Sequence, residues 1–337
     1  MTPLESSLAP FPIAAAQTRP IRIVAAGGGT GLPRVLAGLA PGVEPEGGRP
    51  VDVTAVVTTA DDGGSSGELR RAYGTPAPGD VRNCLVALAE GPNPLAAVLQ
   101  HRFEGGALDG HTVGNVLLTA LAQKLGSFED AVAAVADLLG ARGRVLPGAA
   151  GPVELVARLE DGRVVRGERA IARAGGRVEE VRLARPVDAP AEAVRAVLGA
   201  DLVVLGPGSL YSSILASLLA GGMAEALRET SAVRVLVVNL FTQPGETDGY
   251  AASDHVRAVT RHLGDVVDVA LVQRPPLPAA LVAAQAERGA HPVALDRAGL
   301  DALGAVARVT DLLAPGGVPR HDPQKVARAL LAIARAR

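Results

Sequence analysis

The sequence predicts an α/β protein in which helices flank a mostly parallel β-sheet, with an antiparallel, β-rich insertion at about residues 151–185. Over most of the 337 residues, short β-branched runs alternate with segments whose apolar residues recur at helical spacing. This alternation is typical of βαβ units and parallel sheets. In the insertion, strand-like runs follow one another directly, and Asp161-Gly162 between them is a strong hairpin signal. We expect a single domain over residues 21–337, after a flexible tail at 1–20.

The first half of the chain opens with two predicted strands. The run 21–26 leads into a glycine loop, and Pro33 followed by apolar residues at helical spacing predicts a helix after it. The turn-rich segment 41–50 predicts a surface loop before the second strand, at 51–59. Further helices are expected after Asp80, after Asn115 and over 128–139.

The middle of the chain predicts an antiparallel sheet, and the second half again alternates strands and helices. Three runs predict a β-meander: 153–159, 164–171 and 178–183. Strands are then expected over 202–205, 233–239 and 266–272. Helices are expected over 191–198, from the loop at 206–209 to residue 219, over 253–263, over 279–287 and from Pro323 onward. Asp322 before Pro323 is a good N-cap and first-turn pair.

Composition excludes several classes of protein. Apolar residues make up 48% of the chain, so whole-chain disorder is excluded. With 33 basic and 35 acidic residues, the net charge of −2 argues against a nucleic-acid partner held by bulk charge. The single cysteine, Cys84, excludes a disulfide framework and a multi-cysteine zinc site. Apolar runs are strand-length, and the first residues carry no early positive cluster, so we expect neither a membrane span nor a secretory signal.

Polar, glycine-rich segments follow the predicted strands, and in a parallel sheet such positions share the carboxyl edge, where ligands bind. The first comprises the candidate ligand residues Gly28, Gly29, Thr30 and Gly31. Glycines let a backbone approach an anion, and the following helix N-terminus favours negative charge. The dinucleotide fingerprint and the P-loop lysine are both missing, so a plain strand-to-helix turn is the alternative.

The second segment begins with Asp61 and Asp62 and continues with glycines and serines. Carboxylates at a strand end accept hydrogen bonds from sugar hydroxyl groups or hold Mg²⁺. Direct phosphate contact is disfavoured, because two neighbouring carboxylates repel an anion. The alternative is a helix cap and turn, in which Asp, Gly and Ser are all common.

Several polar residues mark the starts of predicted helices. The candidates are Asp80, Arg82, Asn83, His111 and Asn115. Helix capping alone explains Asp80, whereas Arg82 is the more diagnostic residue if it faces the site. A lone histidine is usually structural, and no second ligand stands at metal spacing. A general acid or a substrate hydrogen bond is the other interpretation of His111.

The loop after the strand at 202–205 is the best phosphate cradle. It offers Gly206, Gly208, Ser209 and Tyr211 between a strand and a helix, although a plain turn capped by Ser209 is the alternative. In the next such loop, Thr242 and Gln243 carry groups suited to a base edge, and Tyr250 is a candidate to stack on a base or sugar. Alternatively, Tyr250 packs the start of the following helix.

Six motifs in this order resemble the gluconeogenesis factor family (YvcK type), within the 2-phospho-L-lactate transferase (CofD-like) superfamily. The resemblance covers about residues 21–315. The motifs are GGGTG at 27–31, TTADDGGSSGELR at 58–70, PGDVRNCLVALA at 78–89, HTVGN at 111–115, GPGSLYSS at 206–213 and TQPGETDGYAASDH at 242–255. One departure is Ala216-Ser217, which stands where the family has a Pro-Asn pair.

The resemblance implies a Rossmann-like fold, a cytoplasmic protein and binding of a UDP-sugar such as UDP-N-acetylglucosamine. It also implies a role in cell-wall morphogenesis under gluconeogenic growth. The transferase relatives use Mg²⁺ to move a phospholactyl group. The sequence offers no nucleophile with its own base, so we expect a binding and regulatory protein without a metal; a Mg²⁺-dependent phospho-group transferase is the alternative. A homo-oligomer is compatible with the sequence.

Overall fold

The structure, a computed structural model, describes residues 19–40 and 49–336. The predictions of a tail and of a loop after the first helix therefore fall, for residues 1–18 and 41–48, outside the described residues. The main sheet has seven parallel strands in the order β10-β9-β8-β7-β1-β2-β3. Their bounds are β1 Ile21–Gly27, β2 Val51–Val57, β3 Arg144–Pro147, β7 Leu202–Leu205, β8 Val233–Val237, β9 Val269–Gln273 and β10 Val306–Thr310.

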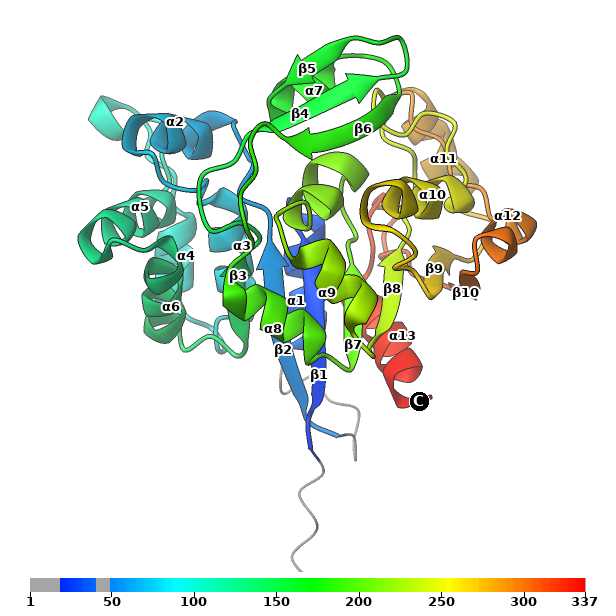
Figure 1. The fold of residues 1–337 in the computed structure, drawn as a ribbon, viewed down its shortest axis with the longest axis horizontal. Coiled ribbons are helices and arrows are strands. Elements are labelled where there is room, and N and C mark those ends of the chain that lie inside the picture. Colours follow the sequence, from blue (N-terminus) through cyan, green and yellow to red (C-terminus); the bar gives the residue numbers. More distant parts are fainter. Residues whose placement is uncertain (1–18, 41–48, 337) are drawn as a thin grey trace, which may run out of the picture.

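Strand order reverses direction between two central neighbours, β1 and β7. From β1 the chain builds outward through β2 to β3, and the later strands build the other way, from β7 to β10. The strands pair in parallel, with Ala25 of β1 opposite Ala55 of β2 and Val204 of β7. All carboxyl ends thus point to one edge, at the top of Figure 1. A crevice at such a reversal is where open α/β sheets bind ligands.

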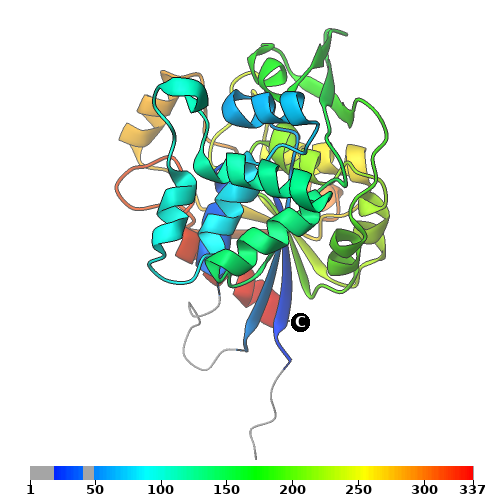
Figure 2. The same cartoon turned by 90° about the vertical axis from the view of Figure 1, so that its left-hand side faces the viewer.

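Helices cover both faces of the sheet (Figure 2). Because side chains alternate along a strand, Ile23 and Val24 of β1 enter two separate buried clusters. The Ile23 cluster includes α1 Gly31–Leu39, α3 Gly79–Leu88, α5 Val113–Leu125, α6 Phe128–Leu139 and α13 Pro323–Arg335. The Val24 cluster includes α8 Ala191–Leu198, α9 Met223–Glu229 and α10 Ala252–Leu263. The remaining helices are α2 Gly64–Tyr73, α4 Pro94–Gln100, α7 Glu168–Arg173, α11 Ala279–Ala286 and α12 Arg297–Ala302.

Several helix ends follow the predicted chemistry. Asp322 caps α13 by accepting a hydrogen bond from the Lys325 amide, with Pro323 in the first turn. Gly140 closes α6 in the left-handed conformation, at φ 57°. Among the described residues, none of these helices combines the length and the apolar character that a bilayer crossing requires.

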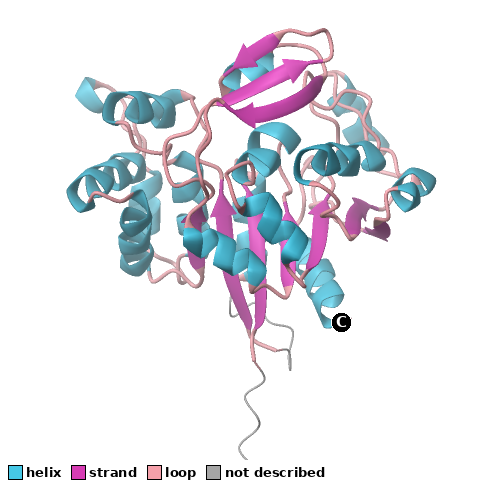
Figure 3. Cartoon of the chain, viewed as in Figure 1, coloured by secondary structure: helices cyan, strands magenta, loops and turns pink. Residues whose placement is uncertain are grey.

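The insertion is a separate antiparallel sheet in the order β5-β4-β6, with bounds β4 Leu155–Leu159, β5 Val164–Arg166 and β6 Val178–Leu183. It lies above the carboxyl edge of the main sheet (Figures 1 and 3). The expected meander is wrong in detail, because β4 is central and β6 pairs with β4. The expected strand at 164–171 ends at Arg166. Gly167, at φ 92°, then turns the chain into α7.

Other elements also differ from the prediction, among them α4, α12 and the edge strand β10, which the sequence analysis did not expect. Residues 64–67, expected as loop, begin α2, and β3 adds an edge strand that the sequence did not indicate. After the loop at 206–209 the expected long helix is only a π-helical turn, Leu210–Ile214, followed by a 3₁₀ turn, Leu215–Ser217. Glu246 accepts hydrogen bonds from the Tyr211 and Ser212 amides, at 3.1 and 3.2 Å. These bonds tie the start of that turn to another loop.

Candidate functional site

A cleft of about 550 Å³ lies at the carboxyl edge of the main sheet, where strand order reverses. Its walls come from the loops after β1, β7 and β8, from α7 and from residues 319–321. Eight residues that the sequence predicted line it: Gly28, Gly29, Thr30, Gly31, Gly208, Ser209, Thr242 and Gln243. Of the four polar segments expected after strands, those that contain Gly28, Gly208 and Thr242 line the cleft, and Asp61 lies beside it, with one oxygen within 4.8 Å of one from Glu168.

The first glycine loop is held by close backbone approach. A side chain at Gly31 would collide with the carbonyl oxygen of Pro207, in the loop after β7. A Cβ at Gly28 would lie 2.5 Å from the Asp80 carboxylate. These two positions therefore require glycine. Because Gly31 has no side chain, the loops after β1 and β7 can approach closely and form the floor of the cleft.

Asp80 supports this loop from beneath. Its Oδ2 accepts a hydrogen bond from the Gly29 amide at 2.8 Å, and its side chain does not cap its own helix. Burial raises the pKa of Asp80 to about 6; the nearby Asp61 adds to the rise, whereas the Gly29 hydrogen bond opposes it. Asp80 does not line the cleft, so its effect on a ligand is exerted through the glycine loop.

The opposite wall is braced by side-chain amides. Asn239 Nδ2 donates to the carbonyl oxygen of Gly208 at 2.9 Å, and Gln243 Nε2 donates to Ser209 Oγ at 2.8 Å. The Thr242 hydroxyl accepts from the His291 amide at 3.0 Å. Gly206, at φ 81°, lies behind this wall and does not line the cleft.

Three arginines that the sequence did not single out line the cleft: Arg34, Arg288 and Arg320. They come from α1, from the turn after α11 and from the loop before α13. Burial and the positive charge of Arg320 lower the pKa of Arg34. Across residues 19–40 and 49–336, none of the three guanidinium groups forms an ion pair. Like charges placed together without carboxylate partners favour an anionic ligand.

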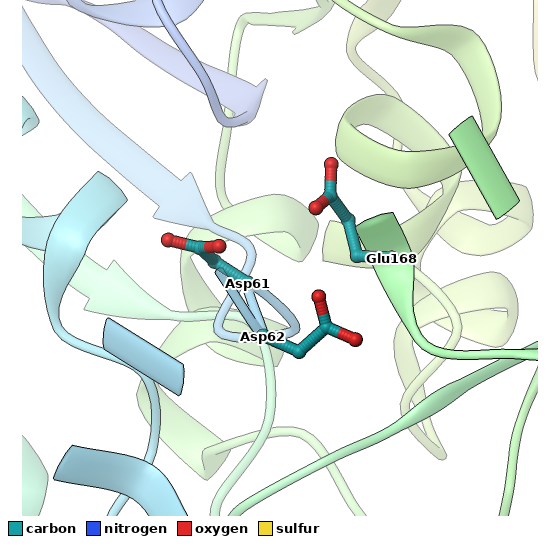
Figure 4. A group of neighbouring side chains, drawn as sticks. All are labelled: Asp61, Asp62 and Glu168. Carbon is teal, nitrogen blue, oxygen red and sulfur yellow. The ribbon is translucent and has the colours of Figure 1, made fainter. Parts of the chain in front are cut away.

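A carboxylate group stands beside the cleft. Asp61 and Asp62 follow β2, and Glu168, which the sequence reasoning missed, begins α7 and lines the cleft (Figure 4). One oxygen from each lies within 4.8 Å of the others. Burial raises the pKa of Glu168 to about 7, and Asp61 and Asp62 add to the rise. One signal in the sequence could have marked Glu168: it directly follows Gly167, a glycine inside the expected strand at 164–171, where glycine often marks a break.

The group fits a divalent cation. Asp61 Oδ1 accepts the Gly63 amide at 2.8 Å, and Asp62 Oδ1 accepts the Arg169 amide at 3.0 Å. Each aspartate therefore keeps its second oxygen, and Glu168 keeps both. Carboxylate oxygens are the donors that Mg²⁺ takes in proteins, usually together with waters and substrate phosphates.

Four predicted residues form a network outside the cleft. Arg82 donates to Asn115 Oδ1 and to Asn83 Oδ1, each at 2.8 Å. Asn115 Nδ2 donates to Ser65 Oγ at 3.1 Å, and His111 Nδ1 lies 3.0 Å from the same hydroxyl. Ser65 is in the first turn of α2, directly after the aspartate loop. The network thus braces the carboxylates rather than lining the cleft.

Tyr211 and Tyr250 lie in the core. They are 1% and 7% exposed, and their hydroxyl groups are 2.7 Å apart. The Tyr250 ring meets His255 edge-on and lies under the Arg177 guanidinium. Neither tyrosine lines the cleft, so the positions of these rings do not support stacking on a ligand there. The departure at Ala216-Ser217 also lies outside the cleft lining.

Comparison with known proteins places the chain among close relatives. A family model described as 2-phospho-L-lactate transferase CofD matches residues 23–313. The gluconeogenesis factor of Halalkalibacterium halodurans is 43% identical, over 92% of this chain and 95% of its own length. A relative from Deinococcus radiodurans is 45% identical over 93% of this chain, which spans 66% of that relative's length. A crystal structure from Bacillus halodurans is 41% identical with a TM-score of 0.87, over 93% of this chain and 99% of that one.

Proposed function

Because this chain belongs to the gluconeogenesis factor family within the CofD superfamily, we propose that its cleft binds a UDP-sugar such as UDP-N-acetylglucosamine. In this proposal the protein is a cytoplasmic regulator of cell-wall morphogenesis under gluconeogenic growth, and binding of the ligand controls its activity as a regulator. The proposal needs neither a nucleic-acid partner nor a membrane partner.

The observation that carries the proposal is the meeting of two glycine loops with three unpaired arginines. The loops at 28–31 and 206–209 expose backbone at the reversal of strand order, where α1 also begins. Arg34, Arg288 and Arg320 add positive charge to the same cleft. A diphosphate matches this charge and the exposed backbone. Asn239 keeps its side-chain carbonyl oxygen, and Gln243 one N–H group, for the uncharged parts of a nucleotide.

A second candidate function is a Mg²⁺-dependent transferase of a phosphorylated group. The observation that favours it is the carboxylate group of Asp61, Asp62 and Glu168 at the edge of the same cleft. A bound Mg²⁺ would neutralise phosphate charge there. The residues of the chain itself would bind and orient the ligand, since no hydroxyl group among the described cleft residues is hydrogen-bonded to a carboxylate or an imidazole that could act as its base.

Calorimetry with UDP-N-acetylglucosamine, UDP and Arg34→Gln tests the proposal. Because this variant loses a charge-assisted contact to the diphosphate, its affinity for both ligands should fall by roughly tenfold or more. Arg335→Gln, which removes an exposed arginine at the end of α13, is the matched control and should bind like the unmodified protein. If Arg34→Gln bound both ligands with the same affinity as the unmodified protein, the proposed phosphate site would be contradicted. Release of UDP or UMP with Mg²⁺ and candidate acceptors would instead establish the transferase.

A further inference from the structure

Glu168 reaches the cleft from a different part of the molecule than the other polar residues around it. It is the first residue of α7, in the insertion, and it lines the cleft together with Ala172 of the same helix. The remaining lining residues belong to loops at or after the main strands and to the helices packed on that sheet. A carboxylate from the insertion thus faces a site whose floor is built by the sheet.

The position of Glu168 is fixed from both sides. Before it, a side chain at Gly167 would collide with the Asp62 carboxylate. After it, the Arg169 amide donates to Asp62 Oδ1 at 3.0 Å. The start of α7 is therefore docked on the loop after β2, so Glu168 is held at the cleft rather than carried on a free surface loop.

The Glu168 carboxylate has no partner within the described part of the chain: it forms no hydrogen bond and no ion pair there. The charges that act on it are all negative and come from Asp61, Asp62, Asp80 and Glu246. These carboxylates repel phosphate, whereas the three arginines that line the same cleft attract it. A bound nucleotide sugar is thereby oriented, with its diphosphate away from Glu168 and its uncharged, hydroxyl-bearing part toward it.

We propose that Glu168 determines sugar specificity: its carboxylate accepts hydrogen bonds from hydroxyl groups of the sugar, and the insertion is the element that recognises this part of the ligand. Hydroxyl groups are donors that satisfy a carboxylate without adding negative charge. This inference rests on the proposed function, because it assigns the sugar end of the same ligand.

The test is calorimetry of Glu168→Gln with UDP-N-acetylglucosamine, UDP-glucose and UDP, in buffer containing EDTA. The buffer is at a pH of about 8.5, above the raised pKa of Glu168, so that the carboxylate is charged. The glutamine oxygen still accepts a hydrogen bond but lacks the charge that strengthens it, so the affinity for both UDP-sugars should fall by roughly tenfold. UDP lacks the sugar, and its affinity should stay within about twofold. Glu154→Gln, on the same insertion but outside the cleft lining, should bind all three ligands like the unmodified protein.

Each other outcome overturns the inference in a recognisable way. Unchanged UDP-sugar affinity would show that Glu168 does not contact the sugar. If the affinity for UDP fell as much as the affinity for the UDP-sugars, Glu168 would contact the diphosphate. If affinity fell only when Mg²⁺ replaced EDTA, Glu168 would bind a cation. If the unmodified protein binds neither UDP nor a UDP-sugar, the proposed function itself fails. Matching melting temperatures of Glu168→Gln and Glu154→Gln keep a folding defect from being mistaken for lost recognition.

Discussion

The hydroxyl groups of Tyr211 and Tyr250 satisfy each other inside the core. Tyr250→Phe removes one partner and leaves the Tyr211 hydroxyl buried and unpaired. We expect a loss of about 1–3 kcal/mol in the free energy of unfolding, measured by urea denaturation. The affinity for UDP-N-acetylglucosamine should be unchanged, since neither ring lines the cleft.

The double variant Tyr211→Phe/Tyr250→Phe is the control for this pair. Replacing both hydroxyl groups removes the unpaired polar atom, so the double variant should lose less stability than the sum of the single variants. Additive losses in stability, or a clear drop in ligand affinity for Tyr250→Phe, would contradict the packing role.

His321, at the cleft, makes stability depend on pH. Its Nε2 lies 3.2 Å from the Val238 carbonyl oxygen, and burial lowers its pKa to about 4. A depressed pKa contributes stability that is full above the ordinary value of about 6.5 and is lost as the pH falls through 4. Between pH 7 and pH 3.5 the unmodified protein should therefore lose about 3 kcal/mol more than His321→Gln, in which the amide still donates to Val238. Superimposable profiles of unfolding free energy against pH would refute this.

At the scale of elements, the start of α1 and the loop after β7 depend on one glycine. Gly31→Ala places a methyl group against the Pro207 carbonyl oxygen, so helix and loop must move apart. We expect a stability loss of roughly 1–3 kcal/mol and clearly weaker binding of UDP-N-acetylglucosamine. Gly151→Ala is the control, because its Cβ would meet only Val187, at 4.0 Å. Equal behaviour of both variants in thermal unfolding and calorimetry would count against this account.

Elements also differ in how far local sequence decides them. β1, α1 and α6 follow from β-branched runs, helical spacing and terminal glycines, and they form where expected. In the insertion, residues 168–171, expected as strand, form the start of α7. Glu168, Arg169 and Ala170 are of types that favour helix, and only the β-branched Ile171 favours strand. The left-handed Gly167 ends the strand before them, and Asp62 accepts the Arg169 amide in the first turn of the helix. Asp62 is distant in sequence, so no local pattern shows the contact.

For the whole molecule, the cleft joins segments from both ends of the chain. Binding should slow amide hydrogen exchange at 28–31, 207–213 and 319–321, because a ligand bridging these loops suppresses their local opening. α6, at Phe128–Leu139, has no residue in the cleft and should exchange at the same rate with and without UDP-N-acetylglucosamine. If the ligand slowed exchange only in α6, or in none of the three cleft segments, it would bind elsewhere.

The sequence alone determined the parallel α/β architecture, the β-rich insertion and two glycine loops at the carboxyl edge. These features depend on short-range physics: the period of apolar side chains, and the conformations that glycine permits after a strand. Gly28, Gly31 and Gly208 are therefore assigned to the site by sequence pattern, because strand ends in a parallel sheet share an edge.

Only the tertiary structure decided which polar residues face the cleft. Arg34 and Arg320 are far apart in sequence and meet only because α1 packs against α13 on one face of the sheet. Glu168 arrives from the insertion, whereas Tyr250, a plausible stacking residue by type, is turned into the core against Tyr211. A residue's type shows which chemistry it can perform. Whether it faces ligand or core depends on long-range packing, which no local pattern in the sequence encodes.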